Sequence, residues 1–389
     1  MIHLINPNES RILENAGDRV PIGLRSIAAN TPGAKVYDLN HMTWDEYTAD
    51  FEKDNPLAVG VSVYTSPIVP EALDIAKKLR GRTRLIAGGY HATAMPETLL
   101  PYFDSVVVGE GETSMADAVE FDGVIAGRSH DLGDLLSPGF RGMSDYQMQQ
   151  SGKRTGTLIT SRGCPYSCSF CGKLEDKVRK EPNHKVLGQM SELRAEGFEA
   201  LYFLDDVFTL DIERMRRIVH NVGLPYRVTT RANLINPEKI TLLKNTGCDW
   251  ISLGIESGDD NILNYARKGM TTEDNLVAVN LAGEVGINVK GFFIIGLPGE
   301  TEKTARKTIN FAHTLKDYGL TSADFYALCA FPGTPVWRNP DKFGIKITDF
   351  DYTKYLQAGV DVPGVFCETE ELGADRIREL LIEAKELWK

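Results

Sequence analysis

Three cysteines lie close together near the middle of the sequence, at Cys164, Cys168 and Cys171. Cysteine thiolates are the usual ligands of iron–sulfur clusters. The Cys-x-x-x-Cys-x-x-Cys spacing must put all three on one loop. Three protein ligands would hold three irons of a four-iron cluster and leave the fourth iron open to bind and reduce a substrate. The run therefore predicts a cluster that takes part in chemistry rather than one that only passes electrons on.

A structural zinc site and ordinary buried thiols are the alternative interpretations of these cysteines. Zinc normally takes a fourth Cys or His, and the nearest later one is His184. The spacing, and the aromatic Phe170 just before the last cysteine, resemble the signature loop of the radical S-adenosylmethionine (SAM) superfamily. This resemblance implies a 4Fe-4S cluster held by the three cysteines, SAM bound at the open iron, and Phe170 among the cofactor contacts.

Composition sets the class of the protein. A length of 389 residues suggests two domains, and 42% hydrophobic with 25% charged residues is ordinary for a globular chain. The net charge of −11 disfavours a nucleic-acid partner. No apolar run approaches the roughly 20 residues that span a bilayer, and the start lacks a basic export signal. Clustered cysteines fit a reducing compartment, so we expect a cytoplasmic protein without a membrane partner.

Residues 1–128 alternate short apolar runs with helical stretches. Such a pattern indicates a doubly wound parallel sheet, because buried parallel strands read as continuous apolar runs and alternate with helices. We expect strands at 2–5, 35–38, 57–63, 84–87, 105–108 and 123–126, and helices at 22–29, 69–79, 95–100 and 113–120.

Distinctive residues follow several of these strands, at the edge where parallel sheets bind ligands. Glycines at this edge let the backbone approach a large ligand and offer amide groups to phosphate. Gly-Gly-x-His-x-Thr at 88–93 follows the fourth strand, and Gly-Glu-Gly-Glu at 109–112 follows the fifth. These motifs, in this order, resemble the cobalamin-binding domain joined to many radical SAM enzymes. The resemblance implies cofactor contacts from Tyr64, Ser66, Gly88, Gly89, His91, Gly109, Glu110, Gly111 and Glu112.

The Asp-x-His-x-x-Gly motif that would supply a histidine ligand to cobalt is absent. We therefore expect any cobalamin to bind without protein histidine ligation, and His91 to contact the loop or the nucleotide tail rather than cobalt. A domain that kept the fold and lost the corrinoid is the alternative.

Residues 129–154 read as a linker rich in Gly, Pro and Ser, and a second alternation begins at 155. Six β/α units after a cofactor loop predict a partial (β/α)6 barrel over 155–342, with its chemistry at the carboxyl ends of the strands. A small C-terminal extension over 343–389 would cap the barrel mouth. Strands are expected at 155–160, 200–204, 226–230, 250–254, 289–295 and 324–328, with helices at 186–196, 212–220, 237–245, 272–285 and 301–318.

The ends of these strands provide the candidate site. By the resemblance, Asp205 and Asp206 lie near the SAM amino group, Glu256 and Ser257 at the ribose, and Ile295 at the adenine. Arg231 suits a carboxylate of methionine or substrate, since its planar fork pairs with carboxylates; a structural ion pair is equally open. Tyr326 and Cys329 are candidate catalytic hydrogen donors, although a buried cysteine is usually inert packing.

The resemblance implies that the enzyme cleaves SAM at the cluster to a 5′-deoxyadenosyl radical, which abstracts hydrogen from an unactivated carbon. Methylcobalamin would then supply a methyl group. Rearrangement, cyclisation or oxidation without methyl transfer is the nearest alternative, and a non-catalytic cobalamin sensor a more distant one. A methylthiotransferase is disfavoured, because such enzymes typically carry three further cysteines in the N-terminal domain and residues 1–163 contain no cysteine. The expected partners are a small-molecule or peptide substrate and a reductant such as flavodoxin or ferredoxin.

Overall fold

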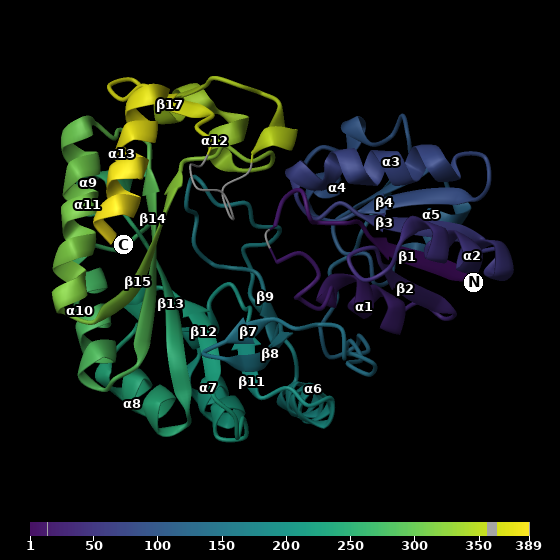
Figure 1. Cartoon of the computed structure of the whole chain (residues 1–389), viewed down its shortest axis with the longest axis horizontal. Coiled ribbons are helices and arrows are strands. Elements are labelled where there is room, and N and C mark those ends of the chain that lie inside the picture. The colour runs from purple at the N-terminus through teal and green to yellow at the C-terminus, as the bar shows by residue number, and fades with distance from the viewer. Residues whose placement is uncertain (14, 356–363, 389) are drawn as a thin grey trace. The chain divides into compact units, whose positions relative to one another are not determined.

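The computed structural model describes residues 1–13, 15–355 and 364–388, which form two compact units. Unit 1 comprises Met1–Thr157 and Lys180–Phe198, and unit 2 comprises Leu158–Arg179 and Glu199–Lys389. Each unit contains most of one large, mainly parallel sheet (Figure 1).

The first sheet has six strands in the order β2-β1-β3-β4-β5-β6, and all of its pairings are parallel. This order reverses between β1 and β3, as in doubly wound flavodoxin-like sheets. The predicted sheet is therefore confirmed. Its strands are β1 (Ile2–Asn6), β2 (Ala34–Asp38), β3 (Ala58–Ser62), β4 (Arg84–Gly88), β5 (Ser105–Val108) and β6 (Gly123–Ala126).

Helices cover both faces of this first sheet. On one face, Leu24 of α1 and Met115 of α5 join Leu4, Ile86 and Val107 in one apolar core. Figure 1 shows α3 on the opposite side of the sheet from α1. The helical segments are α1 (Ile22–Ala29), α2 (Trp44–Asp54), η1 (Ser66–Ile68), α3 (Val69–Leu79), α4 (Tyr90–Ala94), η2 (Pro96–Thr98) and α5 (Met115–Glu120); unit 1 also holds β7 (Gln149–Gln150), most of β8 (Lys153–Leu158) and α6 (Asn183–Ala195).

Two expectations for unit 1 are wrong at the level of single helices. Helix α2 was not predicted, although Thr43 and Glu46 form a capping box at its start. The helix expected at 95–100 is replaced by α4 at Tyr90–Ala94 and the short η2 at Pro96–Thr98. Pro96 explains the break, because proline disfavours helical geometry at the residue before it.

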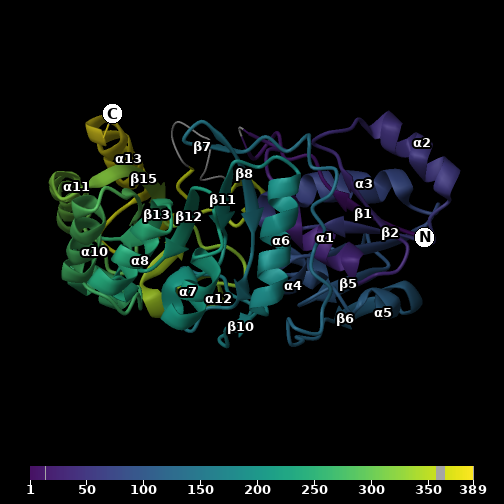
Figure 2. The same cartoon turned by 90° about the horizontal axis from the view of Figure 1, so that it is seen from below.

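The second sheet has the strand order β15-β14-β13-β12-β11-β8-β7, and the pairings from β11 to β15 are parallel. In Figures 1 and 2, α8, α10 and α11 lie along one side of β13 to β15. The sheet curls into a partial barrel, so this part of the predicted fold is also confirmed. The strands of unit 2 in this sheet are β11 (Ala200–Phe203), β12 (Tyr226–Thr230), β13 (Cys248–Glu256), β14 (Asn288–Ile295) and β15 (Leu320–Ala327).

The remaining elements of unit 2 connect these strands or follow them. The helical ones are η3 (Phe208–Leu210), α7 (Ile212–Val219), η4 (Ala232–Leu234), α8 (Pro237–Asn245), α9 (Asp260–Tyr265), α10 (Thr272–Glu284), α11 (Glu302–Asp317), α12 (Pro335–Arg338), η5 (Pro340–Phe343), η6 (Tyr352–Lys354) and α13 (Ala374–Trp388). Short strands are β9 (Ser161–Arg162), β10 (Arg179–Lys180), β16 (Ile345–Ile347) and β17 (Cys367–Thr369).

Alternation along β12, β14 and β15 separates an apolar face from a polar one. Val228, Val289, Phe293 and Phe325 are buried, whereas the residues between them are partly exposed. Successive side chains of a strand point to opposite faces, so the buried set packs under the helices and the other set faces the inside of the partial barrel.

Candidate active site

The cysteine loop is fixed to the end of β11 by Asp205. One carboxylate oxygen of Asp205 accepts the Thr160 N–H at 2.6 Å, and the other accepts the hydroxyls of Thr160 and Ser161, each at 2.6 Å. Asp205 is only 1% exposed. Charge-assisted hydrogen bonds of this kind are strong, so Asp205 anchors the chain just before the first cysteine. The side-chain oxygens of Asp205 are used inside the protein, so a contact with SAM, which stays a prediction, would involve its backbone carbonyl.

Asp206 is the carboxylate of the pair that stays close to the cysteines. Burial raises its pKa, Asp205 raises it further, and a hydrogen bond from the Gly163 N–H partly opposes both effects. Gly163 has φ +91°, a conformation that glycine adopts without strain. Asp206 therefore remains the candidate of the two for a cofactor contact.

Further backbone and side-chain bonds hold the loop in shape. The Lys173 ammonium donates to the carbonyls of Cys164, at 3.1 Å, and Tyr166. The Ser169 N–H donates to Ala266 O at 2.9 Å, and the Ser169 carbonyl accepts the Val336 N–H at 3.0 Å. The loop is thus tied both to itself and to segments that follow β13 and β15.

Arg231 faces the cysteine loop rather than an open carboxylate site. Its Nη1 lies 3.6 Å from Cys168 Sγ, its Nη2 donates to Lys268 O, and its guanidinium carbon lies 3.7 Å from the Tyr166 ring centroid. Arg231 is 5% exposed. The structure places Arg231 beside the Cys168 sulfur, and its pairing with a methionine or substrate carboxylate stays a prediction.

Lys268 is the residue of this site that sequence reasoning missed. Its ammonium lies 2.7 Å from Glu256 Oε1 and 5.9 Å from the Phe170 ring centroid. Lys268 and Glu256 are 5% and 6% exposed. A lone lysine in a loop reads as a solvated side chain, and nothing in the sequence pattern marked this one as buried.

The end of β13 is strained in a way that presents Glu256. Glu256 has φ +67°, a left-handed backbone conformation that is uncommon for a residue with a side chain. The strand register shifts between Gly254 and Glu256. Strained backbone of this kind clusters at functional sites. Ser257, by contrast, is fully buried: its hydroxyl lies 3.1 Å from Thr308 Oγ1 and accepts the Asp259 N–H at 3.2 Å.

The other predicted residues of unit 2 lie in packed surroundings. Ile295 is fully buried, and its neighbour Ile294 is the partly exposed residue. Cys329 is 6% exposed and packs against Tyr355 and Phe366, and burial raises the pKa of its thiol. These placements give neither Ile295 nor Cys329 an exposed side chain.

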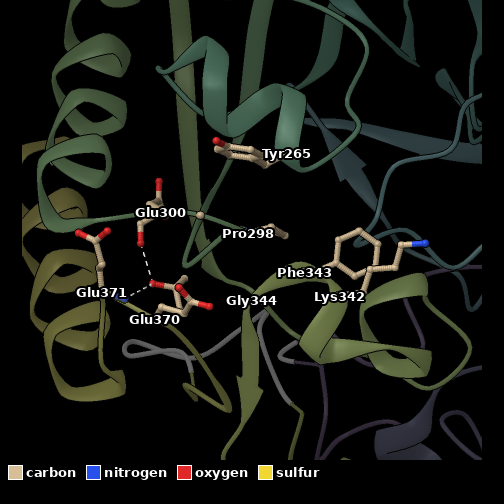
Figure 3. A pocket seen from close by; sticks show the side chains of 10 residues that line it. Tyr265, Pro298, Glu300, Lys342, Phe343, Gly344, Glu370 and Glu371 are labelled. Atoms are coloured by element: carbon tan, nitrogen blue, oxygen red, sulfur yellow. Dashed lines mark hydrogen bonds between the residues drawn. The ribbon is translucent and has the colours of Figure 1, made fainter.

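Beyond the end of β14 lies a pocket of about 260 Å³ that includes the C-terminal segment (Figure 3). Thr369 donates to Glu300 O at 2.6 Å, which joins β17 to the turn after β14. Burial raises the pKa of the Glu300 carboxyl to about 8, although the N–H groups of Gly296 and Leu297 donate to it. In the described part of the chain, its Oε1 has no hydrogen-bond partner.

Three adjacent loops of unit 1 bring the predicted corrinoid contacts to one edge. The Val63 N–H donates to Gly88 O at 2.7 Å, the His91 N–H to Val63 O at 3.0 Å, and the Gly109 N–H to Thr93 Oγ1 at 2.9 Å. Gly89 has φ +114°, and an added Cβ would lie 2.8 Å from Val63 O. Glycine is therefore required where this loop crosses β3.

The side chains at this edge differ in exposure. Tyr64 is 37% exposed, and Gly88, Gly89, Gly109, Glu110 and Gly111 are partly exposed. His91 is fully buried, with Nδ1 2.9 Å from Ser66 Oγ and Nε2 3.1 Å from Thr98 Oγ1. Ser66 and Glu112 are buried too, and Glu112 accepts the Ser26 hydroxyl at 2.8 Å. The His91 ring contacts the loop, which is one of the two roles expected for it, and a contact with the nucleotide tail stays a prediction.

The cysteines and their surroundings fit an iron–sulfur cluster better than a zinc ion. In the described residues, no three His, Cys, Asp or Glu side chains converge as ligands of a single metal ion. Zinc requires such convergence, whereas in a four-iron cluster each cysteine binds a different iron and the sulfurs stand apart. Arg231 and Lys268 supply positive charge beside an anionic group that would otherwise be buried without compensation.

Comparison with known protein families agrees with this chemistry. The model of the radical SAM superfamily matches residues 158–312, which include all three loop cysteines. Residues 158–312 therefore form a radical SAM domain. The model of the B12 binding domain matches residues 11–119, so this radical SAM enzyme carries a B12-binding domain ahead of its cluster loop.

Individual relatives share the arrangement along most of the chain. An uncharacterized methyltransferase of Pyrococcus horikoshii is 28% identical over 379 residues, covering 86% of this chain and 82% of the relative. The anaerobic magnesium-protoporphyrin IX monomethyl ester cyclase of Rubrivivax gelatinosus is 26% identical, with 81% of this chain and 63% of the relative covered. Across four of the relatives, this cyclase included, the chain spans between 43% and 63% of their length.

Among solved structures, the radical SAM methyltransferase TsrM from Kitasatospora setae, with cobalamin and a [4Fe-4S] cluster bound, aligns with a TM-score of 0.71. The alignment covers 97% of this chain and 84% of TsrM at 20% identity. This likeness concerns the fold. Separately, no helix in the described residues of this radical SAM enzyme is long and apolar enough to cross a membrane.

Proposed function

We propose that this radical SAM enzyme transfers a methyl group from cobalamin to an unactivated carbon of its substrate. The observation that carries the proposal is the cysteine loop, anchored by Asp205 and flanked by Arg231 and Lys268, in one chain with a B12-binding domain. The relatives named as methyltransferases support it. When bound, the cluster, SAM and corrinoid supply electron transfer, hydrogen abstraction and the methyl group.

The residues of unit 2 bind and orient these groups. Cys164, Cys168 and Cys171 hold three irons of the cluster. Glu256 accepts hydrogen bonds from ribose hydroxyls, a use that carboxylates serve in nucleotide sites. Lys268 holds that carboxylate in place from 2.7 Å away. Asp206, beside the cluster loop, is the acceptor for an amino group.

The loops of unit 1 bind the corrinoid through backbone and small residues. Gly88, Gly89 and Gly109 permit close approach, Tyr64 offers an exposed ring, and Glu110 and Gly111 complete the edge. We expect cobalt to bind without a histidine ligand, because the Asp-x-His-x-x-Gly motif is absent and the His91 ring is buried against Ser66 and Thr98.

The remaining partners follow from charge and chemistry. A net charge of −11 favours a small molecule or peptide over a nucleic acid. The cluster needs a one-electron donor of the flavodoxin or ferredoxin class. Free cysteines at all six positions fit the reducing cytoplasm.

A second candidate is a reaction of the same cofactors without methyl transfer. The likeness to a relative named as a cyclase over 81% of this chain favours it. The two candidates differ in the fate of the SAM methyl group, which reaches the corrinoid only in the methyltransferase.

The test compares Cys171→Ala with the control Cys248→Ala, which removes a buried thiol that donates to Trp250 O. We expect Cys171→Ala to lose the visible absorbance of the cluster and all 5′-deoxyadenosine formation from SAM. Cys248→Ala should retain both. Full 5′-deoxyadenosine formation by Cys171→Ala would overturn the proposed chemistry.

A further inference from the structure

The inner face of the partial barrel carries a charged group that the proposed cofactor chemistry does not use. It consists of Arg227 on β12, Ser252 on β13, Lys290 on β14 and Asp324 with Tyr326 on β15, with Tyr202 of β11 beside Arg227. All of these strands belong to unit 2. Side chains of Lys290 and Asp324 are 26% and 32% exposed, so solvent reaches this face.

Arg227 is held in a fixed orientation. Its Nε and Nη2 donate to Ser252 Oγ at 2.8 and 2.5 Å, and its guanidinium carbon lies 4.8 Å from the Tyr202 ring centroid. Ser252 is fully buried. A planar guanidinium stacked on an aromatic ring and braced by a hydroxyl presents its remaining N–H groups in one direction.

The two cations of this face differ in their partners. Lys290 lies 2.7 Å from Asp324 Oδ2, and the Tyr326 hydroxyl donates to the same oxygen at 3.0 Å. Arg227 forms no ion pair with a carboxylate in the ranges that the structure describes. With Asp324 neutralised by Lys290, the group retains one positive charge at Arg227.

Arg227 on β12 is nevertheless close enough to influence Tyr326 on β15, the edge strand of the same sheet. Burial and Asp324 raise the pKa of Tyr326, and the charge of Arg227 opposes them. A half-buried arginine without a counter-ion is costly unless an anion joins it. The absence of a carboxylate partner for Arg227 among the described residues therefore indicates where an anionic group would bind.

We propose that Arg227 binds a carboxylate or phosphate group of the substrate. This inference rests on the proposed function and adds the class of substrate to it. Arg227 lies four residues before Arg231, the extended residue that directly follows β12, which is about 13 Å at about 3.3 Å per residue. A substrate anchored there extends roughly that distance from its anionic group toward the edge that holds the cysteine loop.

The test measures how fast phenylglyoxal modifies individual arginines of the anaerobic, full-length protein, read by peptide mass spectrometry. The probes are sodium hexanoate, hexyl phosphate and the neutral hexanamide. Arg216 is the control in the same sample, since it lies on α7 in an exposed pair 2.8 Å from Glu238. At a probe concentration about twice its Kd, an anion should slow modification of Arg227 about threefold.

Protection of Arg227 by an anion, with Arg216 unchanged and hexanamide without effect, supports the site. Hexanoate alone would identify a carboxylate and hexyl phosphate alone a phosphate, and protection by both supports the shared anionic class. Protection by neither anion, equal protection by hexanamide, or an Arg227 that does not react at all overturns the proposal. A second measurement compares hexanoate binding by ligand-observed NMR, which Arg227→Gln should abolish and Arg227→Lys should weaken.

Neither measurement depends on a reaction at the iron–sulfur cluster. If an anion protects Arg227 but the protein forms no 5′-deoxyadenosine from SAM, the proposed function is wrong and the anion site remains supported. The reverse result would remove the anion site and leave the radical chemistry intact.

Discussion

Two acidic side chains with different partners decide how the cluster loop is held. Asp205 accepts three hydrogen bonds from Thr160 and Ser161 at the start of the loop, and Glu256 pairs with Lys268 at its other side. Both carboxylates are buried. Each interaction can be tested by a substitution that removes one of its two sides.

Replacing Asp205 by Ala should release the cysteine loop. The change removes three hydrogen bonds to a charged group, each worth about 1.5–3 kcal/mol. We expect the variant to retain much less iron after reconstitution and desalting, measured by iron and sulfide analysis. Asp274→Ala, which loses an exposed helix cap on α10, is the control and should bind iron as the wild type does. Equal iron content in both variants would show that Asp205 does not anchor the loop.

Replacing Lys268 by Met should leave Glu256 as a buried, unpaired carboxylate. Breaking a buried pair in this way costs about 3–5 kcal/mol. Urea unfolding should therefore shift to a lower midpoint, and SAM binding should weaken. Lys354→Met breaks the exposed contacts with Asp349 and Asp351 and should shift the midpoint little, because exposed ion pairs contribute little to stability. If the two variants unfold at the same midpoint, the Lys268–Glu256 pair is not a significant buried interaction.

At the scale of elements, the loops that follow the strands of unit 1 depend on glycine. Gly89→Ala forces a Cβ to within 2.8 Å of Val63 O at φ +114°, whereas Gly88→Ala meets only Val107 Cβ at 3.9 Å. Strain of this kind costs about 1–3 kcal/mol. Gly89→Ala should lower the thermal midpoint and the amount of corrinoid retained, and Gly88→Ala should change the midpoint little. Equal effects of the two substitutions would contradict the packing of this loop.

The turn after β14 should make stability depend on pH through Glu300. Its pKa rises from 4.5 to about 8 on folding, because burial disfavours the ionised form. The stability contributed by this group is present below pH 4.5 and is lost as the pH rises toward 8. Glu300→Gln removes the titration, so its urea midpoint should fall less than that of the wild type between pH 6 and pH 8.5. A parallel decrease in both proteins would assign the pH dependence to other groups.

Most of the elements follow from the apolar pattern. Helices 22–29 and 69–79 and strands 105–108 and 226–230 agree with α1, α3, β5 and β12 to the residue, because each has a clear period and a turn at its end. Helix α2 was missed since only Tyr47 and Phe51 of its residues are buried. Its capping box at Thr43 and Glu46 was the usable signal.

The candidate site was predicted less completely, for a physical reason. The motif placed three cysteines on one loop, but which of two adjacent carboxylates turns toward that loop depends on how β11 meets it. Arg231 was predicted to pair with a carboxylate or to form a structural ion pair, and its contact with Cys168 was not foreseen. Lys268 acquires its importance only when the segment after α9 folds back on Glu256. Local patterns do not contain such long-range contacts.

At the scale of the whole molecule, one chain holds two sheets with different cofactor chemistry. A B12-binding domain over residues 11–119 and a radical SAM domain over residues 158–312 together predict that corrinoid and cluster are present in one protein. The methyltransferase proposal requires both. Either cofactor alone would leave the methyl group without a donor or the substrate carbon without activation.

The most direct measurement is anaerobic gel filtration of protein reconstituted with iron and sulfide and offered hydroxocobalamin, with the absorbance of the protein peak read for both cofactors. We expect stoichiometric amounts of cluster and corrinoid to elute with the protein. Adding SAM and reductant should then convert the bound corrinoid to methylcobalamin. Cluster without corrinoid would contradict the methyltransferase proposal, and a protein peak without cluster would contradict the assignment of Cys164, Cys168 and Cys171.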